Sequence, residues 1–330
     1  MKKVLVTGAA GFIGSHLCEY FLTTYPTIEV IGVDDLSAGK IEYLANALKT
    51  HPRFRLYEHT LGSGGFMDNG ADALYADAKD ADGAVFLAAR VGVKVAIDRG
   101  VEVLIDNHEA LEESLELISE SRARFVYASS SEVYGDNETQ PLREDMALHL
   151  PAPTNPRFCY TAQKFYAESY LCGLAKRAAC NAIIARFFNT VGARQNKSYG
   201  AVLPAVVLAV LNDRVATVHK DHEGRVPTRS FIHVYDTCAA IDTLLQKGEV
   251  GQVYNVGAGE ELSIHQLVGV VARVLKQRDA WPSSEVTVGE ALTGCRRRVP
   301  DVSKLLALGW GPAKTLEDAI KDLAAEVICG

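Results

Sequence analysis

A tyrosine and a lysine with complementary chemistry stand four residues apart, at Tyr160 and Lys164. On a helix this spacing places the phenol and the ammonium on one face, one turn apart. A neighbouring positive charge favours the phenolate, so we expect Lys164 to lower the pKa of Tyr160. A phenolate that forms near neutral pH can remove a proton from a hydroxyl group, and the pair therefore predicts a general base.

Three consecutive serines and a glutamate follow directly after the apolar run 125–128. If that run is a strand, these side chains lie at its carboxyl end, where open α/β sheets bind their ligands. Ser130 could hold the oxygen whose proton Tyr160 removes, while Ser131 and Glu132 add a hydroxyl and a carboxylate. The structural alternative for Glu132 is a carboxylate that accepts a hydrogen bond from a nearby backbone amide.

A glycine-rich turn, with Gly8, Gly11 and Gly14, follows the apolar run 4–6 and opens a predicted helix. Such glycines let the backbone approach a pyrophosphate, which then lies at the positive end of the helix dipole. Asp34 ends the next predicted strand, 20 residues after Gly14. A carboxylate there would bond ribose hydroxyls and repel a 2′-phosphate, which favours NAD over NADP. The alternative is a chance turn in some other doubly wound protein.

The elements that must position these residues alternate between short apolar runs and helical patterns. Predicted strands cover 4–6, 30–33, 54–57, 83–87, 125–128 and 182–186, and predicted helices cover about 12–23, 101–121 and 160–176. Continuous apolar strands between helices predict a parallel sheet covered on both faces, the doubly wound Rossmann arrangement. The last third of the chain has helices near 204–211, 237–245 and 263–275, with strands at 231–234 and 253–256.

Two domains are expected from this change of pattern and from the length of 330 residues. The first is an NAD-binding Rossmann domain, residues 1–185 with about 230–258. The second is a smaller C-terminal α/β domain for the substrate, residues 186–229 and 259–330.

Composition excludes several classes of function. The net charge of −7, from 34 Lys+Arg and 41 Asp+Glu, argues against broad binding of nucleic acid or of anionic membranes. No apolar run approaches the roughly 18 residues that span a bilayer. The first apolar run stops at Thr7, so it predicts a strand and not a signal peptide. The seven scattered cysteines form no Cys-x-x-Cys pair, which favours reduced thiols, a cytoplasmic location and no zinc site. The histidines at 219 and 222 are interpreted as part of a solvated loop, and no metal is predicted.

Taken together, the motifs resemble the extended short-chain dehydrogenase/reductase superfamily, and within it the NAD-dependent nucleotide-sugar epimerase/dehydratase/decarboxylase group. The resemblance covers nearly the whole chain. It rests on Thr7 to Leu17, Asp34 to Ser37, Leu87 to Ala89, Ser130 to Gly135, Tyr160 with Lys164, Arg186 to Gly192, Arg229 to Val234, Tyr254 to Gly257 and Arg298 to Asp301.

The resemblance implies a role for each matching residue. Tyr160 would deprotonate the 4-hydroxyl of a sugar, Ser130 would share the hydrogen bond to that oxygen, and Lys164 would hold the nicotinamide ribose. NAD would accept the C4 hydride, give a 4-keto sugar and be recycled. The implied cofactor contacts are Gly8, Gly11, Phe12, Ile13, Gly14, Asp34, Asp35, Leu87, Ala88, Ala89, Tyr160 and Lys164. The implied contacts to the nucleotide sugar, which is expected to be UDP-linked, are Arg157, Asn189, Arg229 and Arg298, with the last two at its phosphates. A homodimer through a four-helix contact of the 101–121 and Tyr160 helices is also implied.

The specific reaction depends on the fate of the 4-keto intermediate. A 4-keto group makes a C6 carboxylate a β-keto acid, which loses CO2 readily. Ser131 and Glu132 match the Ser-Glu of UDP-glucuronate decarboxylases, whereas dehydratases usually carry Asp-Glu there, and Arg157 could steer the uronate carboxylate. A UDP-sugar 4-epimerase acting on UDP-glucose or UDP-glucuronate is the alternative, because Ser-Glu-Val-Tyr-Gly also occurs in epimerase-like sequences.

Two more distant alternatives stay open. A catalytically silent NAD-binding protein is favoured slightly by His59 and Thr60, which replace the Gly-Asp whose aspartate usually receives the adenine amino group. A reductase that consumes NAD(P)H is disfavoured by the sequence contexts of Arg229 and Arg298. These arginines are expected to bind a pyrophosphate, and a small carbonyl substrate has none.

Overall fold

Parallel β-strands form the centre of the molecule in the computed structural model, which describes residues 1–62, 71–91, 93–150, 152–155, 158–195, 201–214, 216, 218, 220, 224–276 and 296–329. The strands of the main sheet are β1 (Lys3–Thr7), β2 (Glu29–Asp34), β3 (Phe54–Glu58), β4 (Gly83–Phe86), β5 (Arg124–Ser130), β6 (Asn181–Phe187) and β10 (Val253–Val256). Their order is β10-β6-β5-β4-β1-β2-β3, and neighbouring strands all run parallel.

The order of the strands reverses at β1. This strand pairs with β2 on one side and with β4 on the other, so that Val6 lies opposite both Gly32 and Val85. In open α/β sheets a crevice opens beyond the carboxyl ends of the strands at such a reversal. The predicted Rossmann fold is confirmed, and the reversal places the glycine turn after β1 beside the segment after β4.

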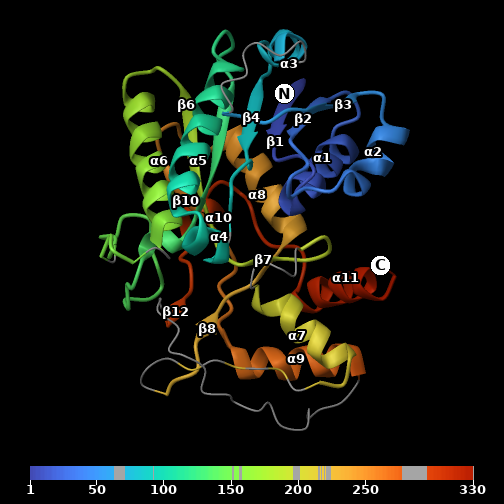
Figure 1. Ribbon diagram of the computed structural model, residues 1–330, viewed down its shortest axis with the longest axis vertical. Coiled ribbons are helices and arrows are strands. Elements are labelled where there is room, and N and C mark those ends of the chain that lie inside the picture. The colour runs from blue at the N-terminus through green and yellow to red at the C-terminus, as the bar shows by residue number, and fades with distance from the viewer. Residues whose placement is uncertain are drawn as a thin grey trace.

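Helices cover both faces of this sheet (Figure 1). Alternate strand residues explain why: Val4 and Val6 pack with α1 (Phe12–Thr24) and α8 (Val234–Lys247), whereas Leu5 faces a second cluster. That second cluster includes side chains of α3 (Ala71–Ala78), α5 (Gly100–Glu116) and α6 (Cys159–Lys176). Strands buried on both faces need apolar residues at every position, which is the pattern that the sequence carries.

A smaller α/β unit has its own core. Side chains of α7 (Val202–Leu211), α9 (Ile264–Lys276) and α11 (Leu316–Cys329) pack together there. Two short sheets join this unit to the larger one: β11 (Leu262–Ser263), β8 (Thr228–Arg229) and β12 (Arg297–Arg298), and then β7 (Thr190–Val191) with β9 (Ile232–His233). The remaining short elements are η1 (Ile41–Leu44), α2 (Ala45–Thr50), α4 (Val93–Asp98), η2 (Ser131–Tyr134) and α10 (Ser303–Leu306).

Several boundaries differ from the sequence predictions for local reasons. The strand expected over 231–234 ends at His233, because the His233 side chain caps α8 by accepting from the Tyr235 amide at 3.0 Å. The helix expected to reach residue 121 ends at Glu116. Ser263 does cap α9, since its hydroxyl accepts from the Gln266 amide at 3.2 Å. Across the described part of the chain, the helices are all too short or too polar to cross a membrane.

Candidate active site

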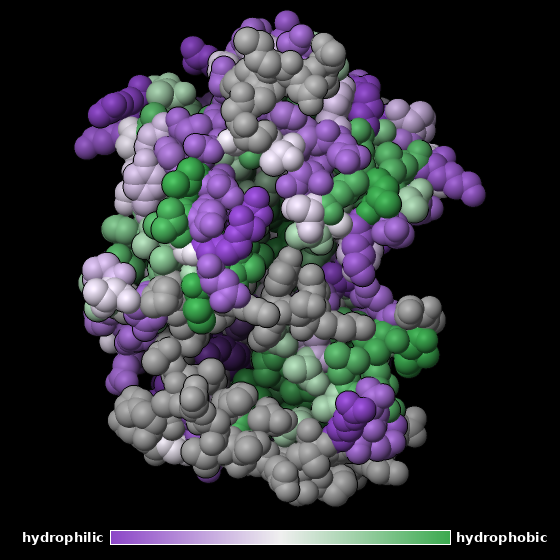
Figure 2. Space-filling view, viewed as in Figure 1, coloured by the Kyte–Doolittle hydropathy of each residue, from purple (hydrophilic) through white to green (hydrophobic). Residues whose placement is uncertain are grey.

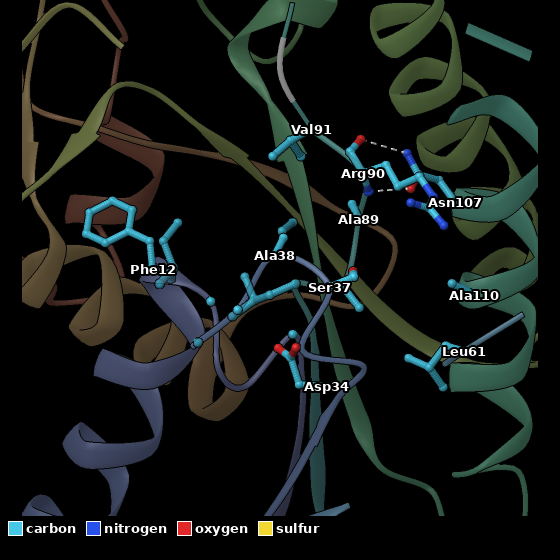
Figure 3. Close-up of a pocket in the computed structure, with 18 of the residues that line it drawn as sticks. Phe12, Asp34, Ser37, Ala38, Leu61, Ala89, Arg90, Val91, Asn107 and Ala110 are labelled. Carbon is cyan, nitrogen blue, oxygen red and sulfur yellow. Dashed lines mark hydrogen bonds between the residues drawn. The ribbon is translucent and has the colours of Figure 1, made fainter. Parts of the chain in front are cut away.

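A cleft of about 1710 Å³ opens at the carboxyl ends of the central strands. Its walls come from the turns after β1, β2 and β4, from the end of β5 and from the start of α6. The sequence-predicted residues that line it are Gly8, Gly11, Phe12, Ile13, Gly14, Asp34, Asp35, Leu87, Ala88, Ala89, Ser130, Tyr160 and Lys164. Figure 3 shows Phe12, Asp34 and Ala89 around this cleft. The topology therefore brings the glycine turn and the proposed base to one cavity.

The glycine turn has a shape that only glycine permits. Gly8 has φ +70°, and a Cβ there would lie 2.8 Å from the carbonyl carbon of Leu87. A Cβ on Gly14 would lie 2.0 Å from the carbonyl oxygen of Gly8. Gly11 is the N-cap of α1 and supplies no side chain to the first-turn amides. The bare helix N-terminus at the cleft fits the pyrophosphate of a dinucleotide.

Asp34 joins two backbone segments at the cleft. Its Oδ2 accepts from the Ala10 amide at 2.9 Å, and its Oδ1 accepts from the Leu36 amide at 2.8 Å. Burial raises the pKa of Asp34, while these two amide bonds oppose that shift. The carboxylate thus fixes the glycine turn against the segment after β2, and Figure 3 shows it at the base of the cleft.

His59 occupies the position where the family resemblance led us to expect glycine. Its Nε2 lies 2.6 Å from Oε1 of Glu113 on α5, and the Gly62 amide donates to the other oxygen of Glu113 at 2.6 Å. His59, Thr60 and Glu113 all line the cleft. A carboxylate is therefore present in this part of the cleft, but it comes from α5 and not from the segment after β3.

The helix α6 presents Tyr160 and Lys164 to the cleft as their spacing predicts. The ammonium of Lys164 donates to the Ala128 carbonyl at 2.7 Å and lies 5.6 Å from the centre of the Tyr160 ring. Ser130 reaches the same place from the end of β5, and its hydroxyl accepts from the Glu132 amide at 3.2 Å. Serine, tyrosine and lysine thus lie together in the cleft, in the arrangement that the sequence predicts for a base with a hydroxyl partner.

The pKa of Tyr160 differs from the sequence expectation. Burial raises this pKa well above its usual value, the negative charge of Glu132 raises it further, and a hydrogen bond with Ser130 lowers it. Burial also lowers the pKa of Lys164 to about 7, and Glu168 opposes that change. Lys164 lies over the ring and bonds a backbone carbonyl, so the expected lowering of the Tyr160 pKa is not found in the protein alone.

Glu132 pairs with Arg298, a contact that the sequence did not indicate. Nη1 of Arg298 contacts Oε1 of Glu132, and Nη2 donates to Oε2 at 3.2 Å. Arg298 is 6% exposed and lies in β12, directly opposite Arg229 of β8. Arg298 was expected at the phosphates of a nucleotide, and its guanidinium contacts Glu132 in η2.

The other predicted substrate contacts lie around the short sheet. Nη1 of Arg229 donates to the carbonyls of Thr228 and Arg296, at 2.7 and 3.0 Å. The side-chain Nδ2 of Asn189 donates to the Ser230 carbonyl at 2.8 Å. Ser131 is buried at the start of η2. Arg157 and the histidines at 219 and 222 lie outside the described residues. No group of three or more potential metal ligands occurs among the residues that the structure describes.

The sequence analysis did not single out several residues that line the cleft, among them Tyr43, Glu113, Arg194 and Glu326. Glu326 belongs to α11, a helix that was not predicted. A signal for it was present, because Thr315 and Asp318 bond each other's backbone amides at 2.9 and 3.1 Å at the start of that helix.

The chain is similar in sequence to known proteins that act on nucleotide sugars. The UDP-glucuronic acid decarboxylase 1 of Xenopus tropicalis is 30% identical over 320 residues, which are 97% of this chain and 70% of that protein. The dTDP-D-glucose 4,6-dehydratase of Mus musculus is 28% identical over 327 residues, 97% of this chain and 87% of the relative.

Solved structures similar to this chain are also those of nucleotide-sugar enzymes. A UDP-N-acetylglucosamine 4-epimerase of Methanobrevibacter ruminantium M1, in complex with UDP-N-acetylmuramic acid, has a TM-score of 0.82 and 26% identity over 99% of this chain and 98% of its own. A double mutant of the dTDP-glucose 4,6-dehydratase DesIV of Streptomyces venezuelae, with NAD bound, has a TM-score of 0.80 and 25% identity over 98% and 96%. The model of the NAD dependent epimerase/dehydratase family matches residues 4–257. The chain therefore belongs to this family, and NAD is its cofactor.

Proposed function

We propose that the protein decarboxylates a UDP-linked hexuronate, with UDP-glucuronate as the first candidate, to a UDP-pentose. The observation that carries this proposal is the pairing of Glu132 with Arg298 beside Ser130 and Tyr160. A substrate carboxylate needs a cation near the reacting carbons, and Arg298 is a buried cation that contacts Glu132, whose charge acts on the proposed base.

The first step would oxidise the sugar at C4. Tyr160, after losing its own proton, takes the proton of the 4-hydroxyl, and Ser130 hydrogen-bonds the same oxygen. Lys164 would hold the nicotinamide ribose when NAD is bound. NAD, when bound, accepts the hydride from C4 and later returns it. The alcohol loses one proton and one hydride, so it becomes a ketone, and no external oxidant is consumed.

The second step would break the bond between C5 and C6. Because the C4 ketone is β to the carboxylate, CO2 can leave while the bonding electrons pass to C5 and toward the C4 oxygen. Hydrogen bonds from Ser130 and from protonated Tyr160 would stabilise the negative charge on that oxygen. C5 then takes a proton from solvent, the hydride returns to C4, and Tyr160 returns its proton to the C4 oxygen, so that one hexuronate and one proton give CO2 and a UDP-pentose. In this scheme Arg298 receives the uronate carboxylate and Glu132 orients Arg298.

Dehydration fits the catalytic segment less well. Loss of a C6 hydroxyl needs an acid that protonates the leaving oxygen. Ser131 stands where the dehydratases that the chain resembles usually carry aspartate, and a serine hydroxyl is a poor acid. The decarboxylase of Xenopus tropicalis at 30% identity supports the same preference. A UDP-sugar 4-epimerase is the second candidate, because the epimerase of Methanobrevibacter ruminantium M1 aligns over 99% of this chain.

We further propose that the protein acts as a homodimer through α5 and α6. Val101, Ile105, Phe165 and Tyr166 are large apolar or aromatic residues on these two helices, and each is more than a third exposed. Figure 2 shows apolar atoms among the polar surface over this pair of helices. A patch of this kind on neighbouring helices is typical of a protein interface.

Mass spectrometry and proton NMR of the purified protein with UDP-glucuronate, without added reductant, test the proposed reaction. We expect loss of CO2, a UDP-pentose product and no net consumption of NAD. Tyr160→Phe should lower turnover by at least about a hundredfold, because it removes the base, yet leave the NAD content unchanged. Arg298→Met should lower the release of CO2 more than it lowers the oxidation of C4.

The other outcomes of this experiment identify other reactions. An unchanged mass with a new C4 configuration would make the protein an epimerase. Silence with UDP-glucuronate, UDP-glucose and UDP-N-acetylglucosamine, or full activity of Tyr160→Phe, would overturn both candidates.

A further inference from the structure

Two cations lie close to one aromatic ring in the lining of the cleft. Nζ of Lys40 lies 5.6 Å from the centre of the Tyr43 ring, and the guanidinium carbon of Arg194 lies 5.7 Å from it. All three residues line the cleft, and they come from the segment after β2, from η1 and from the segment after β7. None of the sequence motifs accounts for this cluster.

Two carboxylates hold Arg194 in place. Nη2 of Arg194 donates to both oxygens of Glu19 on α1, at 3.0 and 2.9 Å. The Arg194 amide donates to Glu326 of α11, which also accepts from the Tyr43 hydroxyl at 3.3 Å. The backbone of Arg194 is left-handed, with φ +64°, a conformation that non-glycine residues adopt rarely and that often marks a functional position.

One arm of this guanidinium is unused. Nη1 of Arg194 is buried and has no hydrogen-bond partner among the described residues, although Nη2 is fully paired. A buried donor without a partner is costly, so such an atom in a ligand cleft points to a missing acceptor. The side chain of Gln195, next in sequence, also lines the cleft and has an unpaired buried oxygen.

The negative charge of the cleft means that an anionic ligand needs a cation beside it. Among its described lining residues are eight carboxylates: Asp34, Asp35, Asp106, Glu109, Glu112, Glu113, Glu116 and Glu326. The pyrophosphate of NAD is an anion and would be repelled by them. Arg90 and Arg99, the other arginines that line the cleft, face carboxylates of their own: Arg90 pairs with Asp106 at 2.6 Å and Arg99 lies 3.8 Å from Glu102. Arg194 also pairs with a carboxylate, but its Nη1 has no partner among the described residues.

We propose that Arg194 binds the pyrophosphate of NAD through Nη1, and that Glu326 of the C-terminal helix holds it in position. The ligand class is a diphosphate that also contacts the amides of the glycine turn. A guanidinium fork with one arm on a carboxylate and one on a phosphate uses the geometry for which arginine is suited. Figure 1 shows α11 as the helix of the smaller core that lies nearest to α1 and α2.

Cofactor retention is a consequence of this arrangement. A cofactor that returns its hydride in each cycle has no need to leave, and Arg194 with Glu326 links the smaller unit across the rim of the cleft to Tyr43. This inference depends on NAD as the cofactor and is independent of which sugar reaction the protein performs.

Release of NAD from the purified holoprotein, measured as cofactor content over time after dilution, tests the proposal. We expect Arg194→Met to release NAD about tenfold faster or more, because charge-assisted bonds to phosphate are lost. Glu326→Gln should have a smaller effect of the same sign. Arg273→Met is the matched control. Arg273 is exposed and lies 3.2 Å from Glu317 of α11, and neither residue is part of the cleft lining.

Calorimetric titrations with ADP and with adenosine, on the full chain freed of NAD, separate phosphate binding from a general loss of structure. Arg194→Met should weaken ADP about tenfold and leave adenosine within twofold of the unaltered protein. Equal weakening of both ligands, or NAD release within twofold of the unaltered rate, would overturn the proposal. If Arg194→Met does not fold, Arg194→Lys and Arg194→Gln are compared instead. Arg194→Lys keeps the positive charge, so it should bind ADP more tightly than Arg194→Gln.

Discussion

At the scale of single residues, burial decides the chemistry of the proposed base. The sequence identifies Tyr160, Lys164, Ser130 and Glu132, because their types and spacing carry that information. It does not reveal the direction of the Tyr160 pKa, since that direction depends on the loss of water and on Glu132, which reaches the phenol from another element. Nor does it reveal that Glu132 is paired with Arg298, because 166 residues separate them.

Glu132→Gln should lower the pKa of Tyr160. Burial is the largest cause of the raised pKa, and the negative charge of Glu132 is the next. Removing that charge makes the phenolate less unfavourable, so Tyr160 ionises at lower pH. The ultraviolet absorption of tyrosinate, followed during an alkaline titration, measures this, with Tyr160→Phe in the same background subtracted to isolate one tyrosine. The exposed Glu138→Gln serves as control. If the pKa of Tyr160 is unchanged or higher in Glu132→Gln, the charge of Glu132 does not raise the pKa of Tyr160.

At the scale of elements, a buried ion pair anchors the strand and the helix that carry the base. Glu168 of α6 bonds Arg186 of β6 at 2.7 Å, and the hydroxyl of Ser129 donates to the same carboxylate. All three residues are less than a tenth exposed. The pair therefore holds β5, β6 and α6 in register beneath Ser130 and Lys164.

Glu168→Ala should lower the free energy of unfolding by about 3–5 kcal/mol, because it leaves the Arg186 charge buried without a partner. Urea unfolding followed by circular dichroism measures this change. Glu317→Ala removes the partner of Arg273 from an exposed pair, so its effect should stay within about 1 kcal/mol. Similar small effects for both variants would show that the buried pair does not anchor these elements.

The predictability of an element depends on its length and periodicity. The strands of the main sheet and the helices α1, α6 and α9 are visible in the sequence, because apolar runs and helical spacing repeat over several residues. The strands β8 and β12 are two residues long and carry no periodicity, yet they place Arg229 opposite Arg298. The placement of α11 against Tyr43 depends on tertiary contacts, and so the role of Glu326 could not be predicted.

At the scale of the whole molecule, the exposed apolar side chains are distributed unevenly. Val101 is 67% exposed and Ile105 is 50% exposed, and they stand four residues apart on one face of α5. Phe165 and Tyr166 of α6 add to the same pair of helices, which pack against each other. Burying this surface against a second copy would remove it from water, and symmetric dimers are the commonest oligomers.

In the proposed dimer, the double substitution Val101→Glu and Ile105→Glu should therefore separate the two copies. Two carboxylates on each copy would have to be buried opposite like charges, which costs far more than the apolar contact provides. Light scattering coupled to size exclusion measures the mass, which should fall from about twice 35.7 kDa to that value. Ile328→Glu is the matched control, because Ile328 is 71% exposed but lies on α11. A monomer before substitution, or a dimer that Ile328→Glu disrupts and the double variant does not, would exclude α5 and α6 as the interface.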